Sequence, residues 1–369
     1  MHSNGQTNWI EVDLEAIRHN VRRLMDITGV QIMAVVKANA YGHGLVEASR
    51  AAVEAGATWL GVARIDEALA LTRAGIPART IVLGYTEPER AAEAAAEGVR
   101  LAVYDCDVVE AYSRGAQEAG RTLWVHAKFD TGMGRLGHAP EDGVEFIRRL
   151  TKTPGLGVEG AFTHLAEADE PEKPTTMRQL ARFDALLESL NAAGLRPGVI
   201  HAANSAGTLG FPQARYDLVR PGIAVFGLNP SETTQLPDDF RPALSWKARL
   251  ASVKTLPPGH GVGYNFKYFT SREERIGVAT VGYADGFRRG MANAALVRGR
   301  RVAVVGGVCM DQCMLQLDHV PDARIGDEVI LIGRQGQEQI RVEEIARAWD
   351  TIAYEVVCGL GARVPRVYV

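Results

Sequence analysis

A repeating pattern between about residues 30 and 225 restricts the possible folds of this chain more than any other feature. Short apolar runs alternate with stretches rich in Ala, Glu and Arg that end near a glycine. Four of these glycines, Gly56, Gly75, Gly98 and Gly120, are 19, 23 and 22 residues apart. Each suits the left-handed position that follows a helix, and the intervals fit one strand and one helix per unit.

Eight of the apolar runs are candidates for strands. They span residues 32–36, 59–63, 80–83, 99–104, 123–127, 158–163, 199–202 and 216–219. Buried strands that alternate with amphipathic helices are typical of parallel βαβ units, and eight such units favour a closed barrel over an open sheet. We therefore expect an α/β fold that begins with a (β/α)8 TIM barrel.

The pattern changes beyond about Pro242, where strand-like stretches replace the helices. These stretches span residues 244–256, 276–283, 295–305, 314–317, 328–332 and 363–369, and one helix at 342–349 interrupts them. The segment 229–242, with its prolines and paired aspartates, has the composition of a linker. We expect a barrel domain at 1–238, with residues 1–14 free to pair with the other domain, and a mostly β domain at 239–369.

Composition and charge exclude several classes of protein. The 41 Lys and Arg residues against 44 Asp and Glu give a formal net charge of −3, which argues against nucleic acid or an anionic membrane as the main partner. The four cysteines are too few for a disulfide framework, and the pair Cys309 and Cys313 lacks the further ligands of a zinc site. We expect a cytoplasmic protein without a metal, and the start MHSNGQTN shows no secretory signal.

Polar residues follow several of the predicted strands. In TIM-barrel enzymes the active site lies at the carboxyl ends of the strands, which is where these residues are expected. In chain order they are Lys37, Lys128, Arg135, His164, Asn204, Ser205 and Arg220. Each alone has an ordinary structural explanation, but packing explains the whole set poorly. A lysine beside other cations in a partly apolar mouth favours the uncharged amine, which forms an imine with an aldehyde. Tyr41, Ser205 and the backbone amides from Arg220 to Ile223 are candidates for holding a phosphate.

A series of motifs gives these residues a family context. The segments are VVKANAYGHG around Lys37, HAKFDTGMGRLG around Arg135, the pair Thr163 and His164, HAANSAG around Ser205, RPGI at Arg220, VGYN around Tyr264, VGYADGFRRG around Tyr283, GGVCMDQ around Met310, and YEVVCGLGARVPRVY from Tyr354. In this order they resemble the alanine racemase family, which is barrel-type and depends on pyridoxal 5'-phosphate (PLP). The resemblance covers nearly the whole chain.

The resemblance assigns two catalytic bases. Racemisation removes a proton from one face of the substrate Cα and returns one to the other face, and a single base cannot easily reach both. By resemblance, Lys37 binds PLP as an imine and acts on one face of the substrate aldimine. Tyr264 acts on the opposite face of a neighbouring subunit's site, which implies a head-to-tail homodimer. His164 and Arg220 are the candidates for adjusting the proton affinity of this phenol.

The resemblance also assigns contacts to cofactor and substrate. Arg220 is expected to face the pyridine nitrogen, where a group that only donates hydrogen bonds disfavours a pyridinium and so favours racemisation over transamination. Arg135 is expected to bind the substrate carboxylate, braced by Lys128, whose position is often carbamylated in the family. The remaining implied residues are Tyr41, His164, Ser205, Gly222, Ile223 and Tyr354 for the cofactor, Met310 for the substrate, and Asp311 and Tyr283 as supporting residues. Tyr354 and Met310 are expected to favour a methyl side chain.

Two departures from the family pattern and three alternatives stay open. Ala353 replaces a frequent proline and could loosen Tyr354, and the segment Phe287, Arg288 and Arg289 could alter the substrate entrance. The main prediction is L-alanine and D-alanine interconversion that supplies peptidoglycan synthesis. The alternatives are a broad-specificity or serine racemase, a PLP-binding regulator without activity, which the β domain opposes, and an amino acid decarboxylase, which Arg220 opposes.

Overall fold

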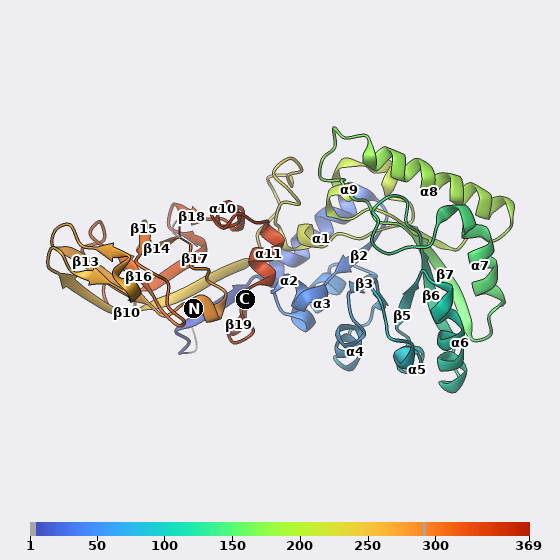
Figure 1. Ribbon diagram of the computed structural model, residues 1–369, viewed down its shortest axis with the longest axis horizontal. Coiled ribbons are helices and arrows are strands. Elements are labelled where there is room, and N and C mark those ends of the chain that lie inside the picture. Colours follow the sequence, from blue (N-terminus) through green and yellow to red (C-terminus); the bar gives the residue numbers. More distant parts are fainter. Residues whose placement is uncertain (1–4, 291–292) are drawn as a thin grey trace. The chain divides into compact units, whose positions relative to one another are not determined.

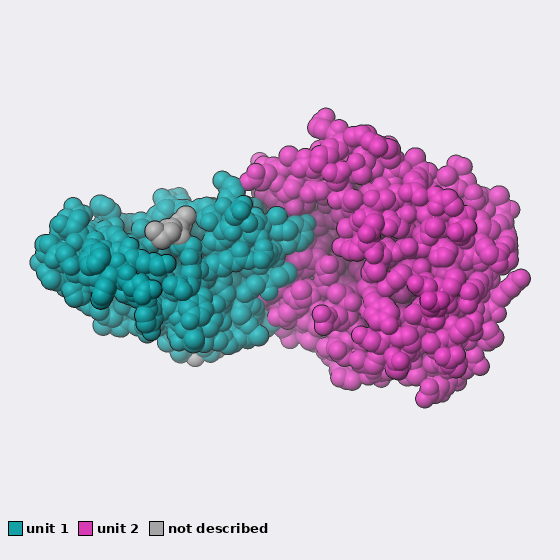
Figure 2. Space-filling model, viewed as in Figure 1, with its two compact units in different colours: residues 1–14, 242–369 teal, residues 15–241 magenta. Residues whose placement is uncertain are grey.

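The structure is a computed structural model that describes residues 5–290 and 293–369, so the first four residues of the MHSNGQTN segment lie outside it. The chain forms two compact units (Figure 2). Residues 15–241 form one unit, called the barrel unit below. Residues up to 14 join residues 242–369 in the other, called the β unit.

The barrel unit contains a closed parallel sheet (Figure 1). Its strands are β2 (Gln31–Val35), β3 (Trp59–Val62), β4 (Arg79–Val82), β5 (Arg100–Val103), β6 (Leu123–Lys128), β7 (Leu156–Phe162), β8 (Val199–His201) and β9 (Leu218–Val219). They pair in the order β8-β7-β6-β5-β4-β3-β2-β9. Backbone hydrogen bonds from Asp217 to Ile200 (3.1 Å) and from Arg220 to Ala203 (2.9 Å) join the two end strands. The predicted eight-stranded barrel is confirmed, with every strand close to its predicted position.

Helices follow the strands and surround them (Figure 1). They are α1 (Leu14–Thr28), α2 (Lys37–Tyr41), α3 (Leu45–Glu54), α4 (Ile65–Arg73), α5 (Ala91–Ala96), α6 (Val109–Glu118), α7 (Gly143–Lys152), α8 (Thr175–Ala192) and α9 (Ser205–Gly210). The four predicted helix-ending glycines all have positive φ, between 62° and 114°. Within the described residues, no helix combines the length and apolar character needed to cross a membrane.

The β unit is built on a nine-stranded sheet in the order β18-β17-β14-β15-β16-β13-β10-β1-β19. Its strands are β1 (Asn8–Val12), β10 (Leu244–Leu256), β13 (Glu274–Ala279), β14 (Ala294–Val297), β15 (Arg300–Val305), β16 (Cys313–Gln316), β17 (Glu328–Gln335), β18 (Glu338–Ile340) and β19 (Arg366–Tyr368), and a separate ribbon pairs β11 (Gly261–Val262) with β12 (Tyr268–Phe269). The early strand β1 pairs with β10 in antiparallel and with β19 in parallel orientation. The prediction of a mostly β second half is confirmed.

Two local predictions in the β unit are wrong. Besides the predicted helix, here α10 (Val342–Ala348), a second helix α11 (Ala353–Cys358) is present. Residues 295–305 form a hairpin, β14 and β15, and not one strand. Its turn places Arg298 and Gly299 at φ of 52° and 74°. Two-residue hairpin turns of this kind need positive φ at both positions. Arginine rarely adopts positive φ, so Arg298 gave no signal for a turn in the sequence.

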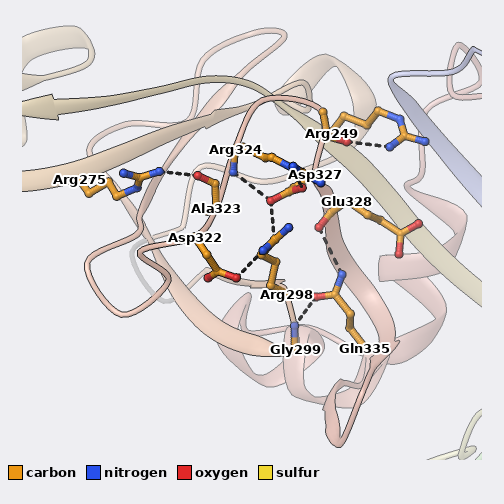
Figure 3. A network of polar contacts seen from close by, with 11 residues as sticks. Arg249, Arg275, Arg298, Gly299, Asp322, Ala323, Arg324, Asp327, Glu328 and Gln335 are labelled. Atoms are coloured by element: carbon orange, nitrogen blue, oxygen red, sulfur yellow. Dashed lines mark hydrogen bonds and ion pairs between the residues drawn. The ribbon is translucent and has the colours of Figure 1, made fainter.

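A polar network ties this hairpin turn to the loop before β17 (Figure 3). The Arg298 side chain donates from Nε to Asp327 Oδ2 at 2.8 Å, and the backbone N–H of Arg324 donates to the same oxygen at 2.9 Å. Arg298 also pairs with Asp322. The Asp327 side chain is only 13% exposed. One mostly buried carboxylate therefore holds two segments of the β unit.

Replacing Asp327 by alanine should lower the free energy of unfolding by about 1–3 kcal/mol, because it removes charge-assisted hydrogen bonds to two partners. The matched control is Arg324→Ala, whose side chain is 78% exposed and approaches the same carboxylate at 3.7 Å. Exposed pairs contribute about 0–1 kcal/mol, so this control should change little. Urea midpoints at constant m-value measure both effects. Equal losses in the two variants would contradict the role of Asp327.

Candidate active site

Lys37 lies two residues after the end of β2 and begins the segment α2, which is an unusual turn at the carboxyl end of the barrel strands. Residues Ala38, Asn39, Ala40 and Tyr41 have φ between 52° and 55°, so four consecutive residues are left-handed and none is glycine. This conformation costs L-residues about 1–2 kcal/mol each, so the surroundings must hold it in place. Backbone strain of this kind concentrates at functional sites.

Side chains close this turn at both ends. The Asn39 Oδ1 accepts the backbone N–H of Leu45 at 2.8 Å. At the other end, the backbone N–H of Ala38 donates to the Glu67 carboxylate at 2.6 Å. The turn that carries Lys37 is therefore held from two sides.

Ser205 and the residues after Arg220 form a small polar cradle. The Ser205 hydroxyl oxygen, buried at the start of α9, accepts the backbone N–H groups of Gly222 at 2.9 Å and Ala224 at 3.3 Å. A Cβ on Gly222 would lie 2.3 Å from the hydroxyl oxygen of Tyr41. Only glycine therefore lets the Tyr41 hydroxyl lie against this turn, which leads into the short 3-10 helix Ile223–Phe226.

Arg220 is 3% exposed and fixes the carboxyl ends of β7 and β8. Its guanidinium donates to His201 Nδ1 (2.8 Å), to the carbonyl oxygens of Thr163 (2.8 Å) and Ala202 (2.9 Å), and to His164 Nδ1 (3.1 Å). Among the described residues no carboxylate pairs with it. Burial lowers the pKa of Arg220, although a guanidinium stays protonated near neutrality. Because arginine only donates, both histidine Nδ1 atoms must be unprotonated acceptors.

A buried polar chain continues from Arg220 into the barrel. With its Nδ1 accepting, His201 carries its proton on Nε2 and donates to His126 Nδ1 at 2.8 Å. The proton of His126 is then on Nε2, which faces Glu159 Oε2 at 3.6 Å. Burial lowers the pKa of both imidazoles. Burial opposes ionisation of Glu159, but the facing His126 and the hydrogen bond from Arg100 lower its pKa to about 2. The neutral imidazoles of His201 and His126 thus lie in a chain between the Arg220 guanidinium at the barrel mouth and the Glu159 carboxylate.

Lys128 ends β6 and is 4% exposed. Burial, reinforced by the charges of Arg135 and Arg220, lowers its pKa to about 8. Burial and the charges of Arg220, Arg135, Lys128 and Lys37 also hold the pKa of His164 well below its ordinary value. Lys128 and His164 therefore both lie within electrostatic reach of Lys37, Arg135 and Arg220, and the sequence placed these five residues after four different strands.

Tyr264 lies in the β unit on the turn between β11 and β12. It is 71% exposed, as the first residue of the 3-10 helix Tyr264–Phe266. Asn265 and Phe266 have φ of 58° and 43°. Phe266 and Phe269 beside it are 59% and 58% exposed. The phenol and the Phe266 ring are thus exposed on a strained turn of the β unit, next to the exposed Phe269 ring of β12.

Tyr283 and Met310 lie on two closely apposed segments. The backbone N–H of Tyr283 donates to the Cys309 carbonyl at 3.0 Å, and that of Ala284 donates to the Met310 carbonyl at 3.0 Å. A Cβ on Gly282 would lie 2.2 Å from the Met310 carbonyl oxygen, so the approach requires glycine. Tyr283 and Met310 are 43% and 53% exposed, which leaves their side chains accessible on the β unit.

Arg363 connects these two segments through carboxylates. It donates to Asp285 at 2.6 Å and to Asp311 at 2.7 Å. Asp285 in turn accepts the backbone N–H of Gly282 at 2.8 Å. These hydrogen bonds raise the pKa of Arg363. The sequence singled out Asp311 but not its arginine partner.

The segment 287–289, which departs from the family pattern, has one buried residue, Phe287, followed by two exposed arginines. Phe287 is 1% exposed and packs edge-on against Trp246 and Trp349. Arg288 pairs with Glu355. A hollow of about 820 Å³ is lined by Tyr283, Gly286, Arg288, Arg289, Trp349, Glu355, Cys358 and Gly359. Tyr354, half-buried, follows the buried Ala353 that begins α11.

Comparisons with known proteins agree with this arrangement. Residues 12–230 match the family model "Alanine racemase, N-terminal domain", and residues 243–368 match "Alanine racemase, C-terminal domain". An alanine racemase of Symbiobacterium thermophilum is 50% identical over 363 residues, which cover 98% of this chain and 96% of that protein. The chain belongs to the alanine racemase family.

Solved structures of the family match the fold. The crystal structure of alanine racemase from Bacillus anthracis with bound L-Ala-P has a TM-score of 0.93 at 41% identity, covering 99% of this chain and 95% of that one. A histidine racemase from Leuconostoc mesenteroides has a TM-score of 0.91 at 32% identity, covering 100% and 99%. This chain is accordingly a PLP-dependent racemase, an isomerase whose reaction interconverts L- and D-alanine.

The residues at the barrel mouth fit PLP. A phosphate needs hydrogen-bond donors, and the hydroxyls of Tyr41 and Ser205 lie beside the turn after Arg220, where Ser205 already accepts two backbone N–H groups and keeps its own proton to donate. An aldehyde needs an amine, which Lys37 supplies.

Sequence reasoning missed Glu67, His126, Glu159 and His201. The signal for His126 and His201 was present, since each is a polar residue inside an apolar run, but nothing local showed that they meet.

Proposed function

We propose that this racemase moves the Cα proton of alanine with two bases, Lys37 on one face and the partner subunit's Tyr264 on the other. The gathering of Lys37 with Lys128, Arg135, His164 and Arg220 carries this proposal. Neighbouring cations favour the uncharged amine, which is the form that accepts a proton. The exposure of Tyr264 on its own unit supports its use by another chain.

The cofactor contacts follow from the donors at the mouth. PLP, when bound, supplies an electron-withdrawing ring that stabilises negative charge on the substrate Cα. Lys37 would hold it covalently, and its phosphate would be held by Tyr41, Ser205, Gly222, Ile223 and Tyr354. Arg220 would face the ring nitrogen, where it donates and cannot accept.

His164 is suited to assist the phenol. Arg220 occupies its Nδ1 as an acceptor, so the proton of neutral His164 is on Nε2, where it can be donated to a phenolate oxygen. Phenols have an ordinary pKa of about 10, so such a donor helps Tyr264 to act near neutrality. We assign Arg135 to the substrate carboxylate, and Lys128 to bracing Arg135 once carbamylated. A lysine pKa near 8 favours that modification, because carbamylation needs the uncharged amine.

Substrate choice would rest on the partner subunit's Met310 and on Tyr354, with Asp311 and Tyr283 in support. The similarity to a histidine racemase favours a second candidate, a racemase of broader specificity on the same scaffold. Relative turnover of alanine, serine and histidine separates the two, since a small pocket rejects the larger side chains. We further propose that the product D-alanine supplies peptidoglycan synthesis in the cytoplasm.

A site shared between subunits should be detectable by complementation. We expect Lys37→Ala and Tyr264→Phe each to be inactive as homodimers. After the two are mixed under subunit exchange, each heterodimer has one intact site, so about a quarter of wild-type activity should return. Racemisation assays and native mass spectrometry follow activity and heterodimer content. Heterodimers without activity would show that both bases come from one chain.

A further inference from the structure

The Glu67 carboxylate uses its two oxygens for two different segments. Its Oε2 accepts the backbone N–H groups of Ala63 at 2.9 Å and Arg64 at 3.2 Å, at the start of its own helix α4. Its Oε1 accepts the N–H of Ala38 at 2.6 Å. Helix α4 follows β3 and the Lys37 turn follows β2, and these strands are paired neighbours. One carboxylate thus bridges the carboxyl ends of two strands.

Helix capping accounts for only one of the two oxygens. A glutamate at this position of α4 satisfies the start of the helix through Oε2 alone. The bond from Ala38 is the shortest of the three, and a carboxylate acceptor makes it charge-assisted. It fixes the peptide unit that directly follows Lys37.

The same bond acts where the backbone is most strained. Ala38 is the first of the four left-handed residues, with φ of 53°. A non-glycine residue stays in this conformation only where its surroundings over-determine it. Holding the Ala38 N–H therefore determines where the Lys37 side chain leaves the backbone.

We propose that Glu67 is a positioning residue for Lys37, which it serves by holding the Ala38 N–H and with it the left-handed turn. The inference rests on the proposed role of Lys37. Positioning of a catalytic group matters because a displacement of about 1 Å can lower a rate by about 100-fold.

Glu67→Gln in the holoenzyme tests this proposal. A glutamine offers one acceptor oxygen, so it must give up either the helix cap or Ala38. We expect kcat to fall about 10- to 100-fold in both directions while KM for alanine changes less than about threefold. We also expect hydroxylamine to release PLP faster, because the lysine that carries it is less well held. This second readout does not depend on turnover.

Asp66→Asn is the matched control. Asp66 lies beside Glu67 in the first turn of α4 and pairs with Arg90 at 3.0 Å. Its removal deletes one negative charge from the same turn, and kcat and hydroxylamine sensitivity should stay at wild-type values. The double variant Ala38→Gly with Glu67→Gln should recover part of the lost kcat, since glycine adopts positive φ without strain.

The outcomes separate this inference from the proposed function. If Glu67→Gln matches Asp66→Asn in kcat and in hydroxylamine sensitivity, Glu67 only caps its helix and the inference is overturned. A loss of kcat in proportion to the unfolded fraction, with unchanged hydroxylamine sensitivity, overturns it too. Borohydride reduction of the wild type, followed by peptide mapping, locates the PLP. PLP on another lysine would overturn both proposals, whereas with PLP on Lys37 the kinetics of the variants decide the role of Glu67 alone.

Discussion

Tyr264→Phe is expected to lower racemisation about 1,000-fold or more from either enantiomer, while PLP stays bound. The change deletes one hydroxyl and keeps the ring, so it removes the base proposed for one face and little else. General acid–base catalysis by one group contributes about 10²- to 10⁴-fold, which sets the expected size. In deuterated water, the enantiomer whose proton faces Lys37 should still exchange its Cα–H slowly, without inversion. Enantiomer-resolved rates and mass spectrometry of the substrate measure this.

Phe266→Leu is the control for the shape of the Tyr264 turn. Phe266 is similarly exposed on the same 3-10 helix but has no ionisable group. This variant should keep most of its activity. Unchanged turnover of Tyr264→Phe in both directions would remove the two-base assignment. Loss of the visible PLP absorbance in that variant would assign Tyr264 to cofactor binding.

Arg220→Gln is expected to lower kcat/KM about 100-fold or more and to change the ratio of products. The guanidinium donates to four acceptors at the mouth, including His164 Nδ1, and an amide has only two N–H donors. Removing one preorganised hydrogen-bond donor typically costs about 10²- to 10³-fold in kcat. Without the cation that we propose to face the ring nitrogen of bound PLP, protonation of that nitrogen would be favoured and would strengthen electron withdrawal. Half-transamination, in which the amino group of alanine would pass to PLP and pyruvate would leave, should therefore increase relative to racemisation.

Arg220→Lys provides the comparison for charge alone. Lysine keeps the positive charge but loses the planar fork that reaches several acceptors at once. Its rate should fall, yet its ratio of pyruvate to racemised alanine should stay near that of the wild type. An unchanged ratio in Arg220→Gln would show that Arg220 serves the architecture of the mouth and not the choice of reaction.

The sequence predicted which basic residues lie at the candidate site but not the hydrogen bonds that hold them in place. Lys37, Lys128, Arg135, His164 and Arg220 follow four predicted strands, with Lys128 and Arg135 after the same one, and barrel topology places such positions at one mouth. In the structure, Lys128 and His164 each lie within electrostatic reach of Lys37, Arg135 and Arg220. Their individual roles, and that of Tyr264, stay predictions. No spacing in the sequence indicated the buried chain from Arg220 to Glu159 or the bridge from Glu67 to Ala38.

The sequence alone determined the strands of the barrel, the glycines that end its helices and the change to a mostly β second half. These features depend on the periodicity of apolar residues within short segments and on the conformational freedom of glycine. Both can be read from residues that are close together in the sequence. Only the tertiary structure decided the left-handed turn after Lys37, the Arg298 hairpin and the pairing of His126 with His201, 75 residues apart. Such features depend on hydrogen bonds between distant segments, which become neighbours only when the barrel closes or, for the Arg298 turn and Asp327, when the β unit folds.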